Sequence, residues 1–163
     1  ISFDANYRES LFSDKKEEFI KSSIDFIKDS NIVKLSEEEV FLISGKDDLY
    51  EAVDNIVKLG CENLIVTLGK DGALVATKEY KEVIKTIPMQ MKDATGAGDA
   101  FIGAVISQIL INSNKDIRDI VRYANIVGGM TTTKVGALES IPTSDEVNDF
   151  ILKINYNIKC NTN

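Results

Sequence analysis

The chain has 163 residues, which corresponds to one domain or to a piece of a larger one, and its 44% hydrophobic content argues against global disorder. A net charge of −7, from 19 basic and 26 acidic side chains, excludes an overall electrostatic footprint for nucleic acid, and no apolar run has the length that spans a bilayer. Because histidine is absent, Ser-His-Asp catalysis, Cys-His catalysis and histidine metal sites are excluded, and Cys61 and Cys160 are expected to be free thiols in a reducing cytoplasm.

The first half of the chain reads as strands alternating with helices. The segment "ISFD" (1–4) predicts a buried strand, and since it begins without a leader we expect a fragment whose N-terminal part is missing. A polar loop follows at 5–13, and isoleucines at helical spacing predict a helix over about 15–29. Next come a strand "NIVKLS" (31–36), a short helix "EEEVFLIS" (37–44) and a helix closed by Gly60, after which 63–69, 72–78 and 81–87 predict three more strands.

The second half predicts a glycine turn followed by three helices. The first helix covers 98–111 and the second covers about 117–132. The third begins at Thr143, because Thr143 and Glu146 have the spacing of a capping box. We therefore expect a domain over 1–154 and a polar, frayed tail over 155–163.

This alternation predicts an α/β fold in which helices cover a mostly parallel sheet. In such sheets ligands bind beyond the carboxyl ends of the strands. Four loops that follow predicted strands carry residues that could bind a ligand: "DANYR", "SEEE", "LGKDG" and "TGAGD". Their convergence at one edge of the sheet predicts a ligand site there.

The turn "TGAGD" is the most informative of these loops. It is not a dinucleotide fingerprint, because Phe101 stands where the third glycine would fall, and it lacks the Lys and Ser/Thr of a Walker A loop. What it offers is a glycine turn whose backbone N–H groups lie at a helix N-terminus, a setting that suits phosphate. Asp99 either stabilises the helix dipole there or acts as a general base toward an attacking hydroxyl, and the local sequence leaves both readings open.

Several stretches together carry a family resemblance. "DATGAGDAF" resembles the second signature of the ribokinase-like (PfkB-type) carbohydrate kinases, and "DANYR", "KLSEEE", "VTLGKDGAL" and "GALESIP" agree in order and spacing. The resemblance implies the C-terminal portion of a ribokinase-like three-layer α/β/α sandwich, closest to the bacterial fructokinases. It implies an ATP-dependent sugar kinase that phosphorylates fructose, with a 2-keto-3-deoxygluconate kinase or another PfkB-type kinase as the alternative. Two hypotheses from other functional classes are a non-catalytic nucleotide-binding module and a Rossmann-type oxidoreductase.

The resemblance also assigns catalytic roles. Asp99 matches the base that deprotonates the sugar hydroxyl, and Gly96, Ala97 and Gly98, with the Asp99 N–H, match the anion hole around the γ-phosphate. Glu39 matches the glutamate that organises Mg²⁺ through water, although an acidic first helical turn is also a common pattern.

Further residues of the resemblance are expected to line the nucleotide or the substrate. Those expected at the nucleotide are Asn6, Arg8, Ser36, Thr67, Gly69, Gly72 and Asn125. The alternatives are a polar surface loop for "DANYR", a simple hairpin at Asp71-Gly72, and an ordinary polar helix face for Asn125.

A monovalent cation site, for K⁺, is the last element of the resemblance. Asp93 and Thr95 would line it, together with backbone carbonyls of Thr131, Lys134 and Gly136 and the hydroxyl of Ser140. Oxygen-only coordination suits a hard cation. We expect a sugar and ATP as partners, no nucleic acid or membrane, and a homodimer formed through an exposed sheet edge. The isolated chain is expected to be inactive, because the family's sugar-covering lid lies upstream of "ISFDANYR".

Overall fold

A five-stranded sheet organises the chain. The computed structural model describes the backbone of residues 1–161 and the side chains of these except 13 and 155–161. The strands are β1 (Ser2–Asp4), β2 (Ile32–Ser36), β3 (Asn63–Thr67), β4 (Ala73–Ala76) and β5 (Lys81–Ile84), and they lie in the order of the sequence. β1, β2 and β3 pair in parallel, whereas β4 is antiparallel to both β3 and β5. Only β4 therefore runs against the others, and the predicted mostly parallel sheet is confirmed.

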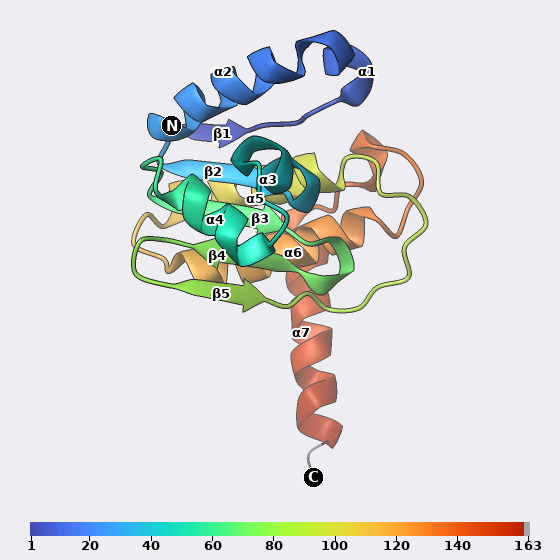
Figure 1. The fold of residues 1–163 in the computed structure, drawn as a ribbon. Coiled ribbons are helices and arrows are strands. Elements are labelled where there is room, and N and C mark those ends of the chain that lie inside the picture. The colour runs from blue at the N-terminus through green and yellow to red at the C-terminus, as the bar shows by residue number, and fades with distance from the viewer. Residues whose placement is uncertain (162–163) are drawn as a thin grey trace.

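Helices cover both faces of this sheet (Figure 1). α2 (Lys16–Lys28), α3 (Glu37–Ser44) and α4 (Leu49–Val57) share one apolar core with β2, β3 and β4. α5 (Ala97–Ile111), α6 (Ile117–Thr131) and the first turns of α7 (Ser144–Asn161) share a second core with β3, β4 and β5. The three-layer α/β/α arrangement follows, as predicted.

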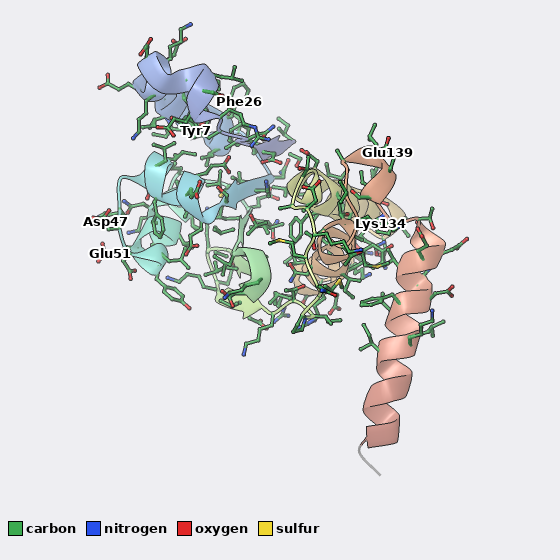
Figure 2. The ribbon with its side chains drawn as sticks, turned by 90° about the vertical axis from the view of Figure 1, so that its right-hand side faces the viewer. Tyr7, Phe26, Asp47, Glu51, Lys134 and Glu139 are labelled. Carbon is green, nitrogen blue, oxygen red and sulfur yellow. The ribbon has the colours of Figure 1, made fainter. Side chains whose placement is uncertain are left out.

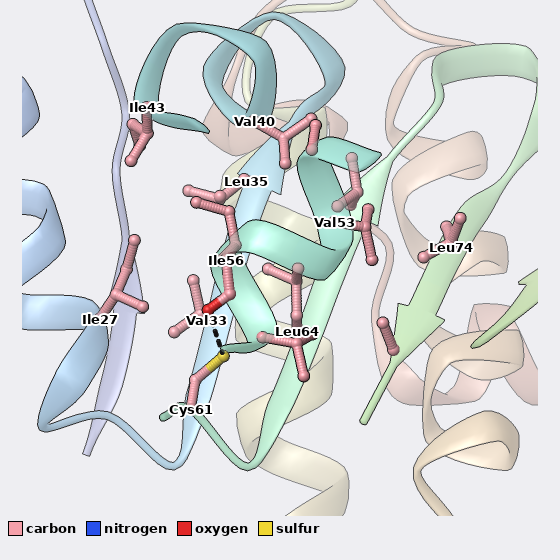
Figure 3. Close-up of a cluster of buried hydrophobic side chains, with 14 of the residues drawn as sticks. Ile27, Val33, Leu35, Val40, Ile43, Val53, Ile56, Cys61, Leu64 and Leu74 are labelled. Carbon is pink, nitrogen blue, oxygen red and sulfur yellow. Dashed lines mark hydrogen bonds between the residues drawn. The ribbon is translucent and has the colours of Figure 1, made fainter. Parts of the chain in front are cut away.

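The alternation of side chains along β3 explains how one strand serves both cores. Leu64 and Val66 point into the first core, and Ile65 between them points into the second. All three side chains are fully buried, which accounts for the continuous run of β-branched and aliphatic residues. Figure 3 shows the first core, in which the thiol of Cys61 lies 4.0 Å from the carbonyl oxygen of Ile56.

Capping boxes stand at the starts of α3 and α7, and the one at α7 was predicted. Ser36 and Glu39 form a complete capping box at the start of α3. At α7 the N–H of Thr143 donates to Glu146 and the N–H of Glu146 donates to the Thr143 hydroxyl, at 2.7 and 3.3 Å, which confirms the predicted start. Among the described residues no helix is long and apolar enough to cross a membrane.

Several boundaries differ from the prediction. The strands predicted over 63–69, 72–78 and 81–87 are shorter, since they end at Thr67, Ala76 and Ile84. The expected polar loop 5–13 contains a short helix, α1 (Glu9–Phe12), because the carbonyl of Arg8 accepts the N–H groups of Leu11 and Phe12. The expected tail begins at 155, but α7 continues as helical backbone to Asn161 and projects from the domain (Figure 1). Residues 162–163 of that predicted tail lie outside the described residues.

The β3–β4 connection depends on one glycine. Gly72 has φ 101°, and its carbonyl accepts the N–H of Leu68 at 2.8 Å to close the turn. A Cβ at this position would lie 2.1 Å from the carbonyl oxygen of Ile84 in β5. Position 72 therefore excludes every side chain, both by conformation and by space.

We expect Gly72→Ala to lower the free energy of unfolding by about 3 kcal/mol, since left-handed strain adds to displacement of the β5 backbone. The matched control is Gly45→Ala, where φ is 68° but no atom lies within 4 Å of the added Cβ. This control should lose only the backbone strain, about 1–2 kcal/mol. Urea unfolding of both variants measures the difference, and equal losses would contradict the close approach of β5.

Candidate active site

The carboxyl ends of β1, β2, β3 and β5 lie at the same edge of the sheet, which we call the strand edge. The register pairs Asp4 with Lys34 and Ser36 with Thr67, so the loops "DANYR", "SEEE" and "LGKDG" start side by side. The N-terminus of α5 joins this edge, because Gly98 lies against the side chain of Lys34. The predicted convergence of the four loops is therefore observed.

The glycine turn at the start of α5 has the geometry of an anion site. Gly96 takes the left-handed conformation with φ 78°, and α5 begins at the next residue. The first amides of a helix have no acceptor within it. That of Ala97 donates to the Ala94 carbonyl at 3.2 Å, which leaves those of Gly98 and Asp99 to donate to a ligand. Asp99 is exposed in this first turn, which leaves its carboxylate accessible to an incoming hydroxyl.

A partly buried ion pair lies beneath this turn. The Lys34 Nζ atom is 3.1 and 3.3 Å from the two carboxylate oxygens of Asp4. Burial raises the pKa of the Asp4 carboxyl, the neighbouring Lys34 ammonium opposes the rise, and the negative charges of Glu39 and Asp99 add to it. The carboxylates of Glu39 and Asp99 are therefore near enough to Asp4 to act on its charge.

Glu39 joins two of the loops. It is only 6% exposed, and its two carboxylate oxygens accept the backbone N–H groups of Tyr7 and Ser36, each at 2.7 Å. The bond to Ser36 completes the capping box, so the acidic first turn of α3 has a structural function. The bond to Tyr7 fixes the "DANYR" loop against α3. Each oxygen keeps a second lone pair for water.

The "DANYR" loop presents its polar side chains at the same edge. Asn6 has φ 47°, a left-handed conformation that asparagine tolerates better than most residues. Asn6 and Arg8 are both exposed, whereas Tyr7 between them packs against the rings of Phe12 and Phe19. This aromatic cluster turns the two polar side chains outward.

The residues predicted for the nucleotide divide into exposed and buried positions. Thr67 is partly exposed and Gly69 is exposed with φ 56°, so both are accessible at the strand edge. Gly72 is buried beneath β5, and its packing accounts for the glycine. Asn125 is 6% exposed and donates its amide to the carbonyl of Ile84 at 2.8 Å, a bond that ties α6 to β5. Contact of these four residues with a nucleotide stays a prediction.

Asp93 holds the signature loop against the loop after α6. One carboxylate oxygen accepts the N–H and the hydroxyl of Thr95 at 2.9 and 2.6 Å, and the other accepts the N–H of Gly136 at 3.0 Å. The hydroxyl of Thr95, the N–H of Gly136 and the N–H of Thr95 lower the pKa of Asp93 from 3.8 to about 2. The Ser140 hydroxyl donates to the Gly136 carbonyl at 2.6 Å, so Asp93, Thr95, Gly136 and Ser140 are brought together.

The side chains of the other two predicted cation ligands, Thr131 and Lys134, interact with other partners. Thr131 is fully buried and its hydroxyl donates to the carbonyl of Val127. The side chain of Lys134, on the loop shown in Figure 2, lies 3.5 Å from Glu146. Across the described residues, no group of three or more Asp, Glu or Cys side chains could hold a metal ion alone.

Comparisons with known proteins identify the family. The family model described as "pfkB family carbohydrate kinase" matches residues 2–144. The chain belongs to the pfkB family of carbohydrate kinases. It is 35% identical to fructokinase-1 of Zea mays over 94% of this chain and 49% of that protein. The chain therefore spans about half the length of the curated relatives that it matches.

Solved pfkB-like kinases have the same fold. A fructokinase double mutant from Vibrio cholerae, in a form with fructose, ADP and potassium ion bound, is 31% identical, with a TM-score of 0.85, over 91% of this chain and 49% of that one. An aminoimidazole riboside kinase from Salmonella enterica, complexed with aminoimidazole riboside and an ATP analogue, is 29% identical, also with a TM-score of 0.85, over 92% and 51%. The ribokinase-like fold is confirmed.

The sequence analysis did not single out Asp4 and Lys34. The signal that could have found them is a lysine within the apolar strand "NIVKLS" and an aspartate at the end of "ISFD". A charged residue inside a buried strand needs a partner, and parallel pairing of these two strands supplies it. Without the register, the two residues could not be matched.

We expect Asp93→Asn to destabilise this kinase domain in a pH-dependent way. Because the pKa of Asp93 is lowered from 3.8 to about 2, the ionised carboxylate stabilises the fold above about 3.8, and this contribution is lost as the pH falls through about 2. Urea unfolding of the wild-type protein and the variant should give a gap in stability that is widest near neutral pH and narrows in acid. A gap independent of pH would contradict the three hydrogen bonds.

Proposed function

We propose that the protein containing this chain is an ATP-dependent sugar kinase that transfers the γ-phosphoryl group of ATP to the 6-hydroxyl of fructose. The observation that carries the proposal is the exposed Asp99 carboxylate in the first turn of α5, directly after the left-handed Gly96. A pure anion binder would have little reason to hold a negative charge beside a phosphate. A phosphotransferase needs that charge as a proton acceptor.

The chemistry assigned to the turn is positioning and charge stabilisation. The N–H groups of Gly96, Gly98 and Asp99, and that of Ala97 once it releases the Ala94 carbonyl, would donate to the oxygens of the phosphoryl group, where negative charge increases in the transition state. Asp99 would accept the proton of the sugar hydroxyl as that oxygen attacks phosphorus. Proton acceptor and anion hole lie within one helical turn, so their relative placement is fixed by the backbone.

The nucleotide is assigned to the edge formed by the strand ends. We infer that Asn6 and Arg8 face its phosphates or the substrate, that Ser36, Thr67, Gly69 and Gly72 line it, and that Asn125 borders the adenine pocket. The exposure of Asn6, Arg8 and Gly69 at this edge supports the inference. An arginine there suits phosphate, because its planar fork can hold two oxygens.

Mg²⁺ and K⁺ are the ions assigned to the protein. Mg²⁺ retains much of its water and binds through few carboxylates and the substrate phosphates. Glu39 fits such a site, because two backbone N–H groups hold its carboxylate in place. For K⁺, the clustering of Asp93, Thr95, Gly136 and Ser140 supports an oxygen-lined site, to which the carbonyls of Thr131 and Lys134 would contribute.

A second candidate is a kinase for another sugar or for a nucleoside. The aminoimidazole riboside kinase has the same TM-score, 0.85, as the fructokinase, so the fold alone favours neither substrate. A 2-keto-3-deoxygluconate kinase is a further alternative, since the "DANYR" and "KLSEEE" elements resemble that branch as well.

The substrate assignment is tested by an ATP-dependent phosphorylation assay on the full-length protein. The acceptor panel contains fructose, 2-keto-3-deoxygluconate, ribose and aminoimidazole riboside. We expect the highest kcat/KM with fructose. Faster turnover of another acceptor would overturn the choice of fructose, and ATP binding without phosphorylation of any acceptor would overturn the kinase assignment.

We expect Asp99→Asn to lower kcat of the full-length enzyme by about 10²–10⁴-fold while the affinity for ATP is largely kept. The substitution keeps the shape of the side chain but removes the proton acceptor. The matched control is Asp145→Asn, because Asp145 is also an acid in the first turn of a helix, α7, and has no function assigned to it in the site. If both variants stayed within a few-fold of the wild type, stabilisation of the helix dipole would be the whole function of Asp99.

A further inference from the structure

A lysine occupies a position in the sheet where an apolar residue would be expected. Lys34 is the central residue of β2 and is 8% exposed, while its neighbours Val33 and Leu35 are fully buried. Burying an ammonium group is costly unless a partner compensates its charge. Asp4, directly opposite in β1, supplies that partner through both carboxylate oxygens.

The ammonium group of Lys34 extends to the turn that begins α5. A Cβ built on Gly98 would lie 3.2 Å from Nζ and 4.0 Å from Cε of Lys34, so the end of the lysine fills the space that a side chain at 98 would need. The ion pair with Asp4 does not by itself require the ammonium group of Lys34 to lie beside Gly98. The lysine is held between the carboxylate on one side and the backbone of the glycine turn on the other.

Stability alone does not account for this arrangement. Replacing a buried ion pair by apolar residues of similar volume is often neutral or stabilising, so the pair is weak evidence for a purely structural function. The location of the ion pair beside α5 explains why a lysine is present in this strand. A fixed positive charge beside the N-terminus of α5 adds to the partial positive charge of the helix end and offsets the carboxylate of Asp99 when an anion arrives.

We propose that Lys34, held by Asp4, is a positioning residue of the phosphoryl-transfer site. This inference rests on the proposed kinase function. The ammonium supports Gly98 and Asp99 from the side of the sheet and places a fixed positive charge behind the anion hole. Lys34 acts through the turn and does not itself contact the substrate.

The test uses the full-length enzyme with Lys34→Met, which keeps the length of the side chain and removes the charge. We expect kcat to fall at least about tenfold per folded molecule, with KM for the sugar within a few-fold of the wild type. The matched control is Lys81→Met, which breaks the ion pair between Lys81 and Asp54 (2.6 Å) far from the strand edge. That control should keep the wild-type kcat.

A double variant separates positioning from folding. Lys34→Met alone leaves Asp4 buried without its cation, so that variant can lose stability. Combining it with Asp4→Asn removes both charges, and we expect unfolding stability near that of the wild type while kcat stays at least about tenfold low. Wild-type kcat in the folded double variant would overturn the inference and leave the kinase assignment intact. A wild-type enzyme that phosphorylates no acceptor would overturn both.

Discussion

The direction of β5 determines the rest of the site. Two antiparallel pairings, β3 with β4 and β4 with β5, reverse the chain twice, so β5 ends at the same edge as β1, β2 and β3. The signature loop that follows β5 then reaches the loops that follow the other three strands. Residues far apart in the sequence, such as Asp4 and Gly98, become neighbours for this reason. If β5 ran the other way, Ile84 would end at the opposite edge of the sheet.

Two carboxylates, one buried and one partly exposed, hold the converging loops in place. Glu39 joins the "DANYR" loop to the start of α3, and Asp93 joins the signature loop to the segment after α6. In both cases the acceptors are carboxylate oxygens and the donors include backbone N–H groups, which are strong hydrogen bonds with fixed geometry. The same oxygens are the groups to which the proposed function assigns cations. Structural and chemical functions therefore coincide in these two side chains, and a substitution at either would affect both.

Local rules predicted much of the fold. The capping box at Thr143–Glu146 located the start of α7, and the glycine spacing located the turn before α5. The prediction was wrong where a non-local contact decides the outcome. α1 forms within a polar segment because Phe12 packs against Tyr7 and Phe19, a cluster that becomes visible only once α2 is in place.

In the site, too, local patterns could be predicted from the sequence, whereas contacts between separate segments could not. The Asp99 turn could be found from its own ten residues, because the chemistry and the helix start are adjacent in sequence. The ion pair of Asp4 and Lys34 could not be found, because it depends on the register of two strands separated by α2. For Asn125 and Gly72, the structure supplied packing reasons that the sequence does not contain: a bond to the Ile84 carbonyl and a close approach of β5.

A crystal structure of the full-length protein with sugar, ADP and fluoroaluminate tests the central claim most directly, because the metal fluoride occupies the place of the phosphoryl group during transfer. The account predicts that its fluorine atoms accept hydrogen bonds from the backbone N–H groups at Gly98 and Asp99, with the Asp99 carboxylate facing the acceptor hydroxyl. Phosphates and metal fluoride bound away from the N-terminus of α5, with Asp99 turned to solvent, would contradict it.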